Sequence, residues 1–471
     1  MSEAAEQSRT RPPLTEHRAH LLIVVLACLG QFMVVLDVSI VNVALPSISQ
    51  DLGFTQATLQ WVVSAYALTF AGLLLLGGRI ADLYGHKRIF IAGVVLFTGA
   101  SLLGGLASTP GLLIAARAVQ GVGAAVLAPA TLTILTTTFT EGPRRAKAIA
   151  SWSAVGAVGG AVGGLLGGLL TEQLSWRWIL LINVPVGIAL VAAAAAFLTE
   201  SARSHGRRGA GLDVAGTLLV TGGISTLAYG TVQSPGHGWD SPQALIPIAL
   251  GVVALAAFVL VEARVSRAPL VPLRLFRSRA VSGGNLVMAL MGAASIAMWY
   301  FLSLHMQENL GYSPVQTGLA FIPHTLTLIV GARLCTRLIP LVGERRLIGI
   351  GSLVAAAGFV WQGRMDPGYV PGVLLPGLLM CLGMALNFTP VALLTTSGAR
   401  DGEAGLLSGL LNTARQVGGS LGLAALATVA AAGATTSDGY GMAFTASAGL
   451  MVVAFAAVFL LPRRPRLSTA A

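Results

Sequence analysis

Long apolar stretches alternate with short polar segments along nearly all of this 471-residue chain. Each stretch holds about 20 mostly hydrophobic residues, the length that a helix needs to cross a membrane. The pattern therefore predicts an all-α integral membrane protein with 14 transmembrane helices. These helices are expected over residues 21–45, 58–78, 88–107, 111–137, 147–170, 178–198, 212–231, 245–263, 281–304, 314–335, 346–363, 371–396, 405–432 and 441–461.

The basic residues of the polar segments indicate how these helices are oriented. Cytoplasmic loops of membrane proteins carry an excess of Lys and Arg. With a cytoplasmic N-terminus, 25 of the 29 basic residues fall on cytoplasmic segments, whereas the outer loops hold only Arg177 and Arg364. Both termini are therefore predicted in the cytoplasm, with a disordered tail over 1–20 and a second tail over 462–471. This topology accounts for the net charge of +11 without nucleic acid as a partner.

Two internal echoes predict that the chain is duplicated. The segment GGRIADLYGHKRI after the second helix has a counterpart, GARLCTRLIPLVGERRLI, after the tenth, and the ends of helices four and twelve also match. We therefore expect two six-helix halves over 21–198 and 281–461, with the two extra central helices in a linker over 199–280. Repeated halves that enclose a site at the membrane midplane are the plan of secondary transporters.

Composition excludes several other classes of protein. A hydrophobic fraction of 55% with only 10% charged residues excludes an ordinary soluble protein. The cysteines Cys28, Cys335 and Cys381 have unrelated spacings, so neither a zinc site nor a disulfide framework is expected. Glycine-rich nucleotide-binding motifs need a soluble strand–helix context, which the sequence lacks. No metal or cofactor is therefore expected, and ATP-driven transport by this chain alone is not expected either.

Asp37 is the carboxylate that lies well inside an apolar run, within the stretch MVVLDVSIVNVALP. A charge at such a position costs about 2.5–3.5 kcal/mol on insertion scales, so it is a functional-site candidate by default. Asn42 and Pro46 also interrupt the apolar character of the same predicted helix. The alternative is a protonated Asp37 that only hydrogen-bonds helices together.

Arg117 is the natural partner of this carboxylate. At 1.5 Å of rise per residue, Arg117 lies about 10 Å below the outer boundary of its helix and Asp37 about 12 Å below that of its own. Each charge is expensive to bury unpaired. The two depths therefore predict a direct or water-bridged pair, with a static salt bridge as the alternative to a role in proton transfer.

The segment from Gly78 to Arg88, GRIADLYGHKR, resembles the loop signature of the major facilitator superfamily. We expect it to form the cytoplasmic loop between helices two and three, with Gly78 and Gly85 permitting tight turns and Lys87 and Arg88 binding carboxylates or lipid phosphate. The resemblance implies that Asp82 tethers the two halves at the cytoplasmic side. A second resemblance, in LxxxRxxQGxGAA around Arg117 and Gln120, implies that this arginine takes part in proton transfer.

The fifth predicted helix carries glycines at every fourth position in two series. Each series forms a flat stripe on which another helix can approach closely. The register AVGGLLGG is similar to an antiporter signature of the superfamily, although Gly164 stands where the family usually has proline. The series are Gly156, Gly160, Gly164 and Gly168, and beside them Gly159, Gly163 and Gly167.

Further motifs across residues 20–460 resemble the fourteen-helix drug–proton antiporter family. They include LDVSIVNVALP, SWRWILLINVPVG, GLDVAG, PLVPLRLF, LGYSPVQTGL and SGLLNTARQVGGSLG. The resemblance implies a transporter, not an enzyme, which exports amphipathic drugs or toxic metabolites across the bacterial cytoplasmic membrane. It implies the proton gradient as energy source, with the lipid bilayer, protons and a small amphipathic substrate as partners of a monomer. A dedicated exporter of a self-made antibiotic, lipid or siderophore is the alternative, and a membrane-embedded enzyme or scaffold is a remote one.

The remaining candidates are polar or aromatic residues inside the predicted helices. His324 is a candidate proton carrier because histidine titrates near neutrality, although it could equally be a packing residue. Arg415 lies about 15 Å from the cytoplasmic face and could meet an anionic substrate group or pair within the C-terminal half. The aromatic candidates either line the cavity or belong to an interfacial belt. The expected cavity residues are Asn42, Tyr66, Gln120, Trp299, Asn412, Arg415 and Gln416.

Overall fold

The structure is a computed structural model that describes residues 16–139, 143–198, 213–264, 272–396 and 404–462. The predicted tails over 1–20 and 462–471 fall mostly outside these ranges, as do residues 199–212 and 265–271 of the linker over 199–280. Regular structure in the described ranges is entirely helical. The first helices are α1 (Glu16–Leu52), α2 (Gln56–Leu59), α3 (Trp61–Tyr84), α4 (His86–Gly105), α5 (Pro110–Thr138), α6 (Pro143–Gln173), α7 (Trp178–Leu181) and α8 (Asn183–Phe197).

The later helices follow the same antiparallel course. They are α9 (Val214–His237), α10 (Pro242–Arg264), η2 (Leu273–Arg277), α11 (Arg279–Leu304), η3 (His305–Asn309), α12 (Pro314–Ala320), α13 (Ile322–Val342), α14 (Glu344–Gln362), η4 (Val370–Leu374), α15 (Leu375–Thr396), α16 (Ala404–Ala431), α17 (Thr436–Ala457) and η5 (Val458–Leu460). The segments η3 and η4 are π-helical turns at the ends of longer helices.

Every predicted apolar run overlaps one of these helices. Among the described residues, 10 helical segments are long and apolar enough to cross a membrane. The helices α3, α9, α14 and α16 are not among those ten. The prediction of an all-helical membrane architecture is therefore confirmed, whereas the number of crossings stays a prediction.

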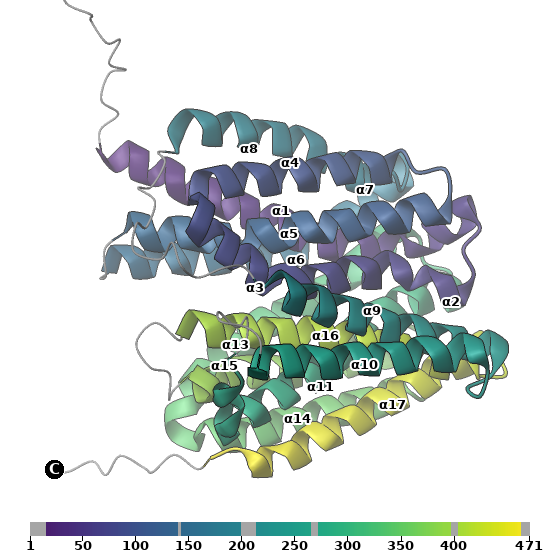
Figure 1. Cartoon of the computed structure of the whole chain (residues 1–471). Helices are drawn as coiled ribbons and strands as arrows, with labels where there is room; N and C mark the ends of the chain where they lie inside the picture. The colour runs from purple at the N-terminus through teal and green to yellow at the C-terminus, as the bar shows by residue number, and fades with distance from the viewer. Residues whose placement is uncertain (1–15, 140–142, 199–212, 265–271, 397–403, 463–471) are drawn as a thin grey trace, which may run out of the picture.

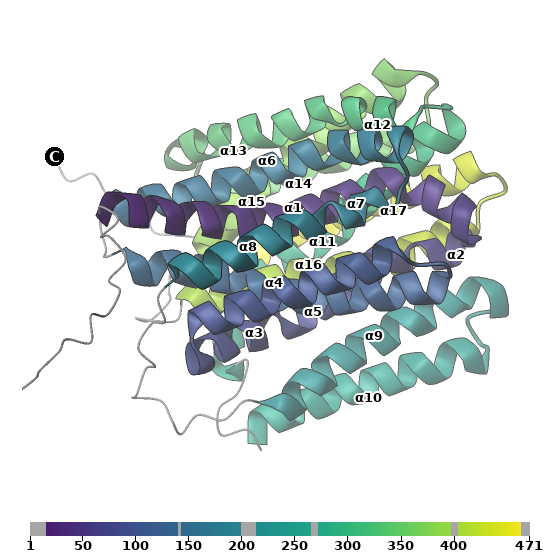
Figure 2. The same cartoon turned by 90° about the horizontal axis from the view of Figure 1, so that it is seen from above.

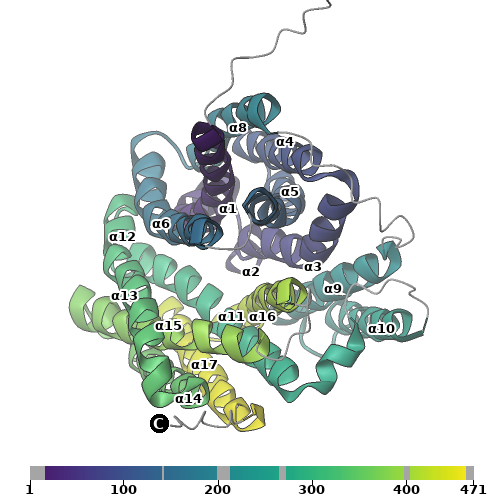
Figure 3. The same cartoon turned by 90° about the vertical axis from the view of Figure 1, so that its left-hand side faces the viewer.

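The helices lie side by side with their axes in roughly one direction (Figure 1). We call the end of the bundle where α1 begins the first face, and the opposite end the second face. Seen along the axes, α1 to α8 form one group, here the first group, and α11 to α17 form the second group (Figure 3). The pair α9 and α10 lies along one edge (Figure 2), where Leu68, Ala228 and Ala424 join α3, α9 and α16 in one buried cluster.

Two predicted boundaries are wrong, and in both cases the helices are longer than predicted. The helix α1 continues through Pro46 to Leu52, and the expected loop from Gly78 to Arg88 is almost wholly helical. Only Gly85 separates α3 from α4, with φ of 96°. An apolar run stops at the first charged side chain, but helical backbone hydrogen bonds continue past it, so hydropathy shortens the helices.

The same one-residue connection recurs in the second group. Gly343, with φ of 84°, separates α13 from α14. A positive φ is readily available only to glycine, which explains why this residue type stands at both breaks. The two segments of the first sequence echo thus share one backbone conformation at their glycines.

Hydrogen bonds join the two groups toward the second face. Ser303 Oγ on α11 donates to the Asn42 carbonyl of α1 at 2.7 Å, and Gln307 Nε2 donates to the Val43 carbonyl at 2.8 Å. The Val315 N–H at the start of α12 donates to Glu172 Oε2 at the end of α6 at 3.1 Å. These contacts hold the two groups together toward the second face.

One glycine stripe of α6 packs against α1. A Cβ at Gly163 would lie 2.6 Å from Ser39 Cβ, and a Cβ at Gly167 would lie 2.7 Å from the Ile40 carbonyl oxygen. Ser39 Oγ also donates to the Gly160 carbonyl at 2.7 Å. The predicted close approach of another helix is therefore confirmed for this stripe.

The last two glycines of the other stripe, Gly164 and Gly168, face α12 of the second group, whereas Gly156 and Gly160 lie nearest to α1. A Cβ at Gly168 would overlap the Pro314 backbone, and a Cβ at Gly318 would overlap the Gly164 carbonyl. Around Gly164 itself there is more room, since the nearest atom to its Cβ position is Phe321 Cδ2 at 3.7 Å. The two stripes thus bind α6 to one helix of its own group and to one helix of the other.

We expect Gly167→Ala to lower the thermal unfolding temperature (Tm) of the purified protein in detergent. The added methyl group would press on the Ile40 carbonyl, and overpacking of this kind costs about 1–3 kcal/mol. Gly164→Ala is the matched control, because its methyl group meets only ordinary van der Waals contacts and gains helix propensity of up to about 1 kcal/mol. Equal Tm values for the two variants would contradict the packing described here.

Candidate functional site

Asp37 of α1 and Arg117 of α5 form a buried ion pair. Arg117 Nη1 lies 2.5 Å from Asp37 Oδ2, and the two side chains are 2% and 0% exposed. The contact predicted from their matching depths is therefore confirmed. Its role in proton coupling stays a prediction.

Three amide and hydroxyl side chains complete this polar network. Gln120 Oε1 accepts from Arg117 Nη1 at 2.6 Å, while Gln120 Nε2 donates to Asp37 Oδ1 at 2.6 Å and to Ser101 Oγ at 2.7 Å. Asn183 Nδ2 donates to Asp37 Oδ1 at 3.1 Å. The carboxylate thus accepts hydrogen bonds from three side chains on two neighbouring helices, α5 and α8, and Ser101 adds α4 to the network.

The remaining contacts of Arg117 come from α3. Its Nε donates to the Val62 carbonyl at 3.0 Å, and its guanidinium lies over the Tyr66 ring, 4.5 Å from the ring centroid. A cation over an aromatic face is attracted by the ring quadrupole. Tyr66 is therefore buried beside the ion pair, and its role in lining a substrate cavity stays a prediction.

Small residues of α5 bring these helices close enough for the network to form. A Cβ at Gly121 would overlap the Tyr66 carbonyl of α3, and a Cβ at Gly123 would lie 2.6 Å from the Phe97 nitrogen of α4. Thr69 Oγ1 of α3 also donates to the Ala118 carbonyl of α5 at 2.8 Å. The motif around Gln120 therefore both supplies polar side chains and sets the helix spacing.

Sequence reasoning missed Ser101 and Asn183. Both are polar residues within apolar runs, about 5 residues or fewer from the second-face ends of α4 and α7–α8, which is close to the depth of Arg117. Matching the depths of uncharged polar residues as well as of charges would have found them. A single Ser or Asn in an apolar helix is common, however, so this signal is weaker than that of a buried charge.

The other predicted cavity residues do not join this network. Asn42 lies where α1 meets α11, and its Nδ2 donates to the Val38 carbonyl of its own helix at 3.1 Å. Trp299 lies beside Phe321, with ring centroids 4.9 Å apart, and 6.4 Å from the ring of His324. The last three predicted cavity residues, Asn412, Arg415 and Gln416, lie together on α16.

The motif around Gly85 lies at the first face, away from the buried network. Lys87 Nζ donates to the Ala195 carbonyl near the end of α8 at 2.9 Å, and Arg88 is exposed. Gly78 is followed by helix, not by a loop. The side chain of Asp82 lies outside the described part of the chain, so its tethering role stays a prediction.

The described residues contain no group of three or more His, Cys, Asp or Glu side chains that could hold a metal ion. In the buried network, Asp37 is the carboxyl group that could bind a proton, and its part in proton coupling stays a prediction. Protonation would remove the charge that Arg117 neutralises. Asp37 is fully buried in this structure.

Comparison with known proteins extends this description to the whole chain. The family model of the Major Facilitator Superfamily matches residues 27–423. The chain is 49% identical to the cephamycin export protein of Amycolatopsis lactamdurans over 94% of its own length and 92% of that protein. It is 43% identical to the puromycin resistance protein of Streptomyces alboniger over 88% and 82%.

Solved structures share the fold at much lower sequence identity. The POT family transporter PepTSo superimposes with a TM-score of 0.69 at 15% sequence identity, over 95% of this chain and 98% of that one. At this level the likeness concerns the fold alone. The family model and the relatives together show that the chain belongs to the major facilitator superfamily.

Proposed function

We propose that the chain is a proton-driven exporter of amphipathic drugs or toxic metabolites in the bacterial cytoplasmic membrane. The observation that carries this proposal is the buried Asp37–Arg117 pair, a protonatable group in a membrane fold whose relatives are named for antibiotic export and resistance. The proton gradient would be the energy source, with no cofactor, and the protein would act as a monomer. A membrane enzyme is not proposed, because the family and its relatives are transporters.

The proposed topology has 14 crossings, with the first face in the cytoplasm. It follows from the excess of basic residues on the segments at that face. The chain would then divide into two six-helix halves over 21–198 and 281–461, with α9 and α10 in the central linker. The hydrogen bonds at the second face would hold this state closed to the exterior.

In the proposed cycle, Asp37 binds a proton from the exterior and releases it to the cytoplasm. A protonated carboxyl group no longer neutralises Arg117, so the network of Gln120, Ser101 and Asn183 has to rearrange. Because these side chains and Asp37 lie on four helices, the rearrangement would change how the first group packs. A proton or a substrate shifts the equilibrium between two states only through its different affinity for them.

A dedicated exporter of one antibiotic is the second candidate function, and Arg415 favours an anionic substrate for it. The guanidinium of Arg415 donates to Asn412 Oδ1 at 3.1 Å on its own helix. In the described ranges no carboxylate lies within ion-pair distance of Arg415, and Asp37 is already occupied by Arg117. An anionic group on the substrate would provide the missing counter-charge, and one relative is named for the export of cephamycin.

We expect Asp37→Asn to abolish gradient-driven transport while leaving the folded protein in the membrane. Everted vesicles with an acidic interior would be supplied with cationic, neutral and anionic amphiphiles, and uptake would be measured with and without the gradient. The reason is that Asn cannot exchange a proton. Asp51→Asn is the matched control, because Asp51 lies on the same helix and also pairs with an arginine, Arg177, but is 45% exposed.

Wild-type transport in the Asp37→Asn variant would rule out this carboxylate as the coupling group. Loss of transport in both variants would point to a general effect of removing an arginine partner. Folding would be checked in each case by size-exclusion chromatography of the purified protein. Expression levels would be matched before the uptake rates are compared.

We expect Arg415→Gln to weaken the transport of anionic amphiphiles selectively. Loss of a hydrogen bond to a charged group costs about 1.5–3 kcal/mol, which corresponds to a roughly 10- to 150-fold higher concentration for half-maximal uptake. Neutral compounds should be transported as by the wild type. Arg177→Gln is the control for the loss of a positive charge elsewhere, and an equal effect on all compounds would contradict anion recognition by Arg415.

A further inference from the structure

His324 is a fully buried imidazole whose two nitrogens both face backbone oxygens. Nδ1 lies 3.0 Å from the Ala320 carbonyl and Nε2 lies 3.2 Å from the Val373 carbonyl. A carbonyl oxygen can only accept, and a neutral imidazole carries a single N–H, whereas the cation carries one on each nitrogen. Both contacts are therefore hydrogen bonds only when His324 is protonated.

The imidazole occupies a slot formed by Gly377 on α15. A Cβ at this position would overlap the His324 ring. Any other residue would therefore displace the imidazole from Val373. On the remaining sides lie the rings of Trp299 and Phe321, with centroids 6.4 Å and 6.1 Å from that of His324.

The two carbonyl groups belong to irregular turns at the second-face ends of their helices. Ala320 is the last residue of α12, before the chain continues as α13. Val373 lies in the π-helical turn η4, and Pro376 just beyond has no N–H to donate. The adjacent Gly372 carbonyl accepts from Gln362 Nε2 at 2.6 Å, so side chains supply hydrogen bonds to this turn.

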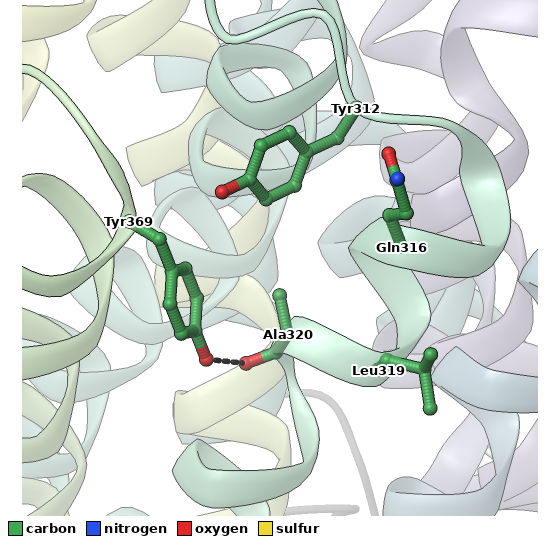
Figure 4. A pocket seen from close by; sticks show the side chains of 5 residues that line it. All are labelled: Tyr312, Gln316, Leu319, Ala320 and Tyr369. Atoms are coloured by element: carbon green, nitrogen blue, oxygen red, sulfur yellow. Dashed lines mark hydrogen bonds between the residues drawn. The ribbon is translucent and has the colours of Figure 1, made fainter.

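A pocket of about 410 Å³ leads from the second face to the Ala320 carbonyl. Tyr312 and Tyr369 face each other across it, with Ala320 at its base, and Tyr369 donates to the same carbonyl oxygen at 3.1 Å (Figure 4). Since a water molecule occupies about 30 Å³ in the liquid, the pocket has room for several. The lining residues are Tyr312, Gln316, Leu319, Ala320 and Tyr369.

Tyr369 and Cys381, titratable side chains on the elements packed against His324, are uncharged near neutral pH. Tyr369 lies directly before η4. Burial, and to a smaller extent Tyr312, raise the pKa of its hydroxyl group. The hydroxyl group therefore keeps its proton and donates to the Ala320 carbonyl. On α15 the next such group is the buried thiol of Cys381, one turn beyond Gly377. From α11 the neighbour is Trp299, which does not titrate. A proton on His324 would thus be held by the two carbonyl dipoles.

We propose that His324 is a second proton-binding site, which is filled through this pocket and clamps α12 to η4 when it is protonated. The proposal rests on the proposed function for its place in transport, because an exporter driven by protons needs a route for them from the exterior. Loss of the proton breaks one of the two hydrogen bonds and releases one turn from the other. The site belongs to the second group, whereas Asp37 belongs to the first.

The direct test is nitrogen NMR of the imidazole in the full-length protein in lipid nanodiscs. The chain has seven histidines, and a variant in which the other six are replaced by Gln keeps His324 as its only signal. We expect a doubly protonated imidazole at about pH 5.5, which is below the ordinary histidine pKa of about 6.5, and a neutral form at higher pH. A single neutral tautomer at every pH from about 5 to 8 would overturn the proposal.

Gly377→Ala in the same six-histidine-to-Gln background tests whether protonation depends on the slot around His324 and not only on the presence of the histidine. The methyl group would displace the ring from the Val373 carbonyl, so the doubly protonated signal should be lost while the histidine is still present. A doubly protonated signal that persists unchanged would show that the slot does not hold the proton. Neither measurement requires transport, so a failure of the proposed function would leave the test of this site intact.

Transport then tests the link between the two proposals. His324→Gln should change how gradient-driven export depends on the pH of the exterior, whereas His305→Gln, at a buried histidine near the end of α11, should leave it as in the wild type. An unaltered dependence in His324→Gln, together with a titrating imidazole, would overturn its role in coupling. An altered dependence in His324→Gln alone would support it.

Discussion

A charge in the apolar interior of a helix bundle has to be neutralised and hydrogen-bonded, and this constraint governs the first group of helices. Asp37 meets it through Arg117, Gln120 and Asn183, which come from two other helices, and Arg117 is held in turn by α3. An unpaired buried charge is strongly destabilising. The positions of α1, α3, α5 and α8 relative to one another are therefore tied to this one ion pair and its hydrogen bonds.

The two groups of helices solve their polar contacts differently. The first group buries a pair of opposite charges, whereas the second holds a histidine between backbone carbonyls and an arginine without a carboxylate partner in the described residues. Between the groups, the glycine stripe of α6 and the hydrogen bonds from Ser303 and Gln307 join backbone to backbone and side chain to backbone. Such contacts involve no charge pairs, so they can separate and re-form at low electrostatic cost.

Sequence reasoning predicted what depends on regular helix geometry. The rise per residue placed Asp37 beside Arg117, and the four-residue spacing of glycines predicted the packing faces of α6. It missed Ser101 and Asn183, because burying an uncharged polar residue without a partner costs less than burying a charge, so such a residue alone does not indicate a site. It also mistook the segment around Gly85 for a loop, since hydropathy records where lipid ends and not where backbone hydrogen bonding ends. The carbonyl pair around His324 depends on a π-helical turn that no periodic pattern announces.

The single-residue breaks at Gly85 and Gly343 have a mechanical consequence. A connection of one residue holds the adjoining helix ends close together, so α3 and α4 form one tight helical hairpin, as do α13 and α14. If one helix of such a hairpin tilts, the other has to move with it, even where few side chains of the two helices touch. A tilt of one of these helices in the bundle interior would therefore displace the whole hairpin at the first face.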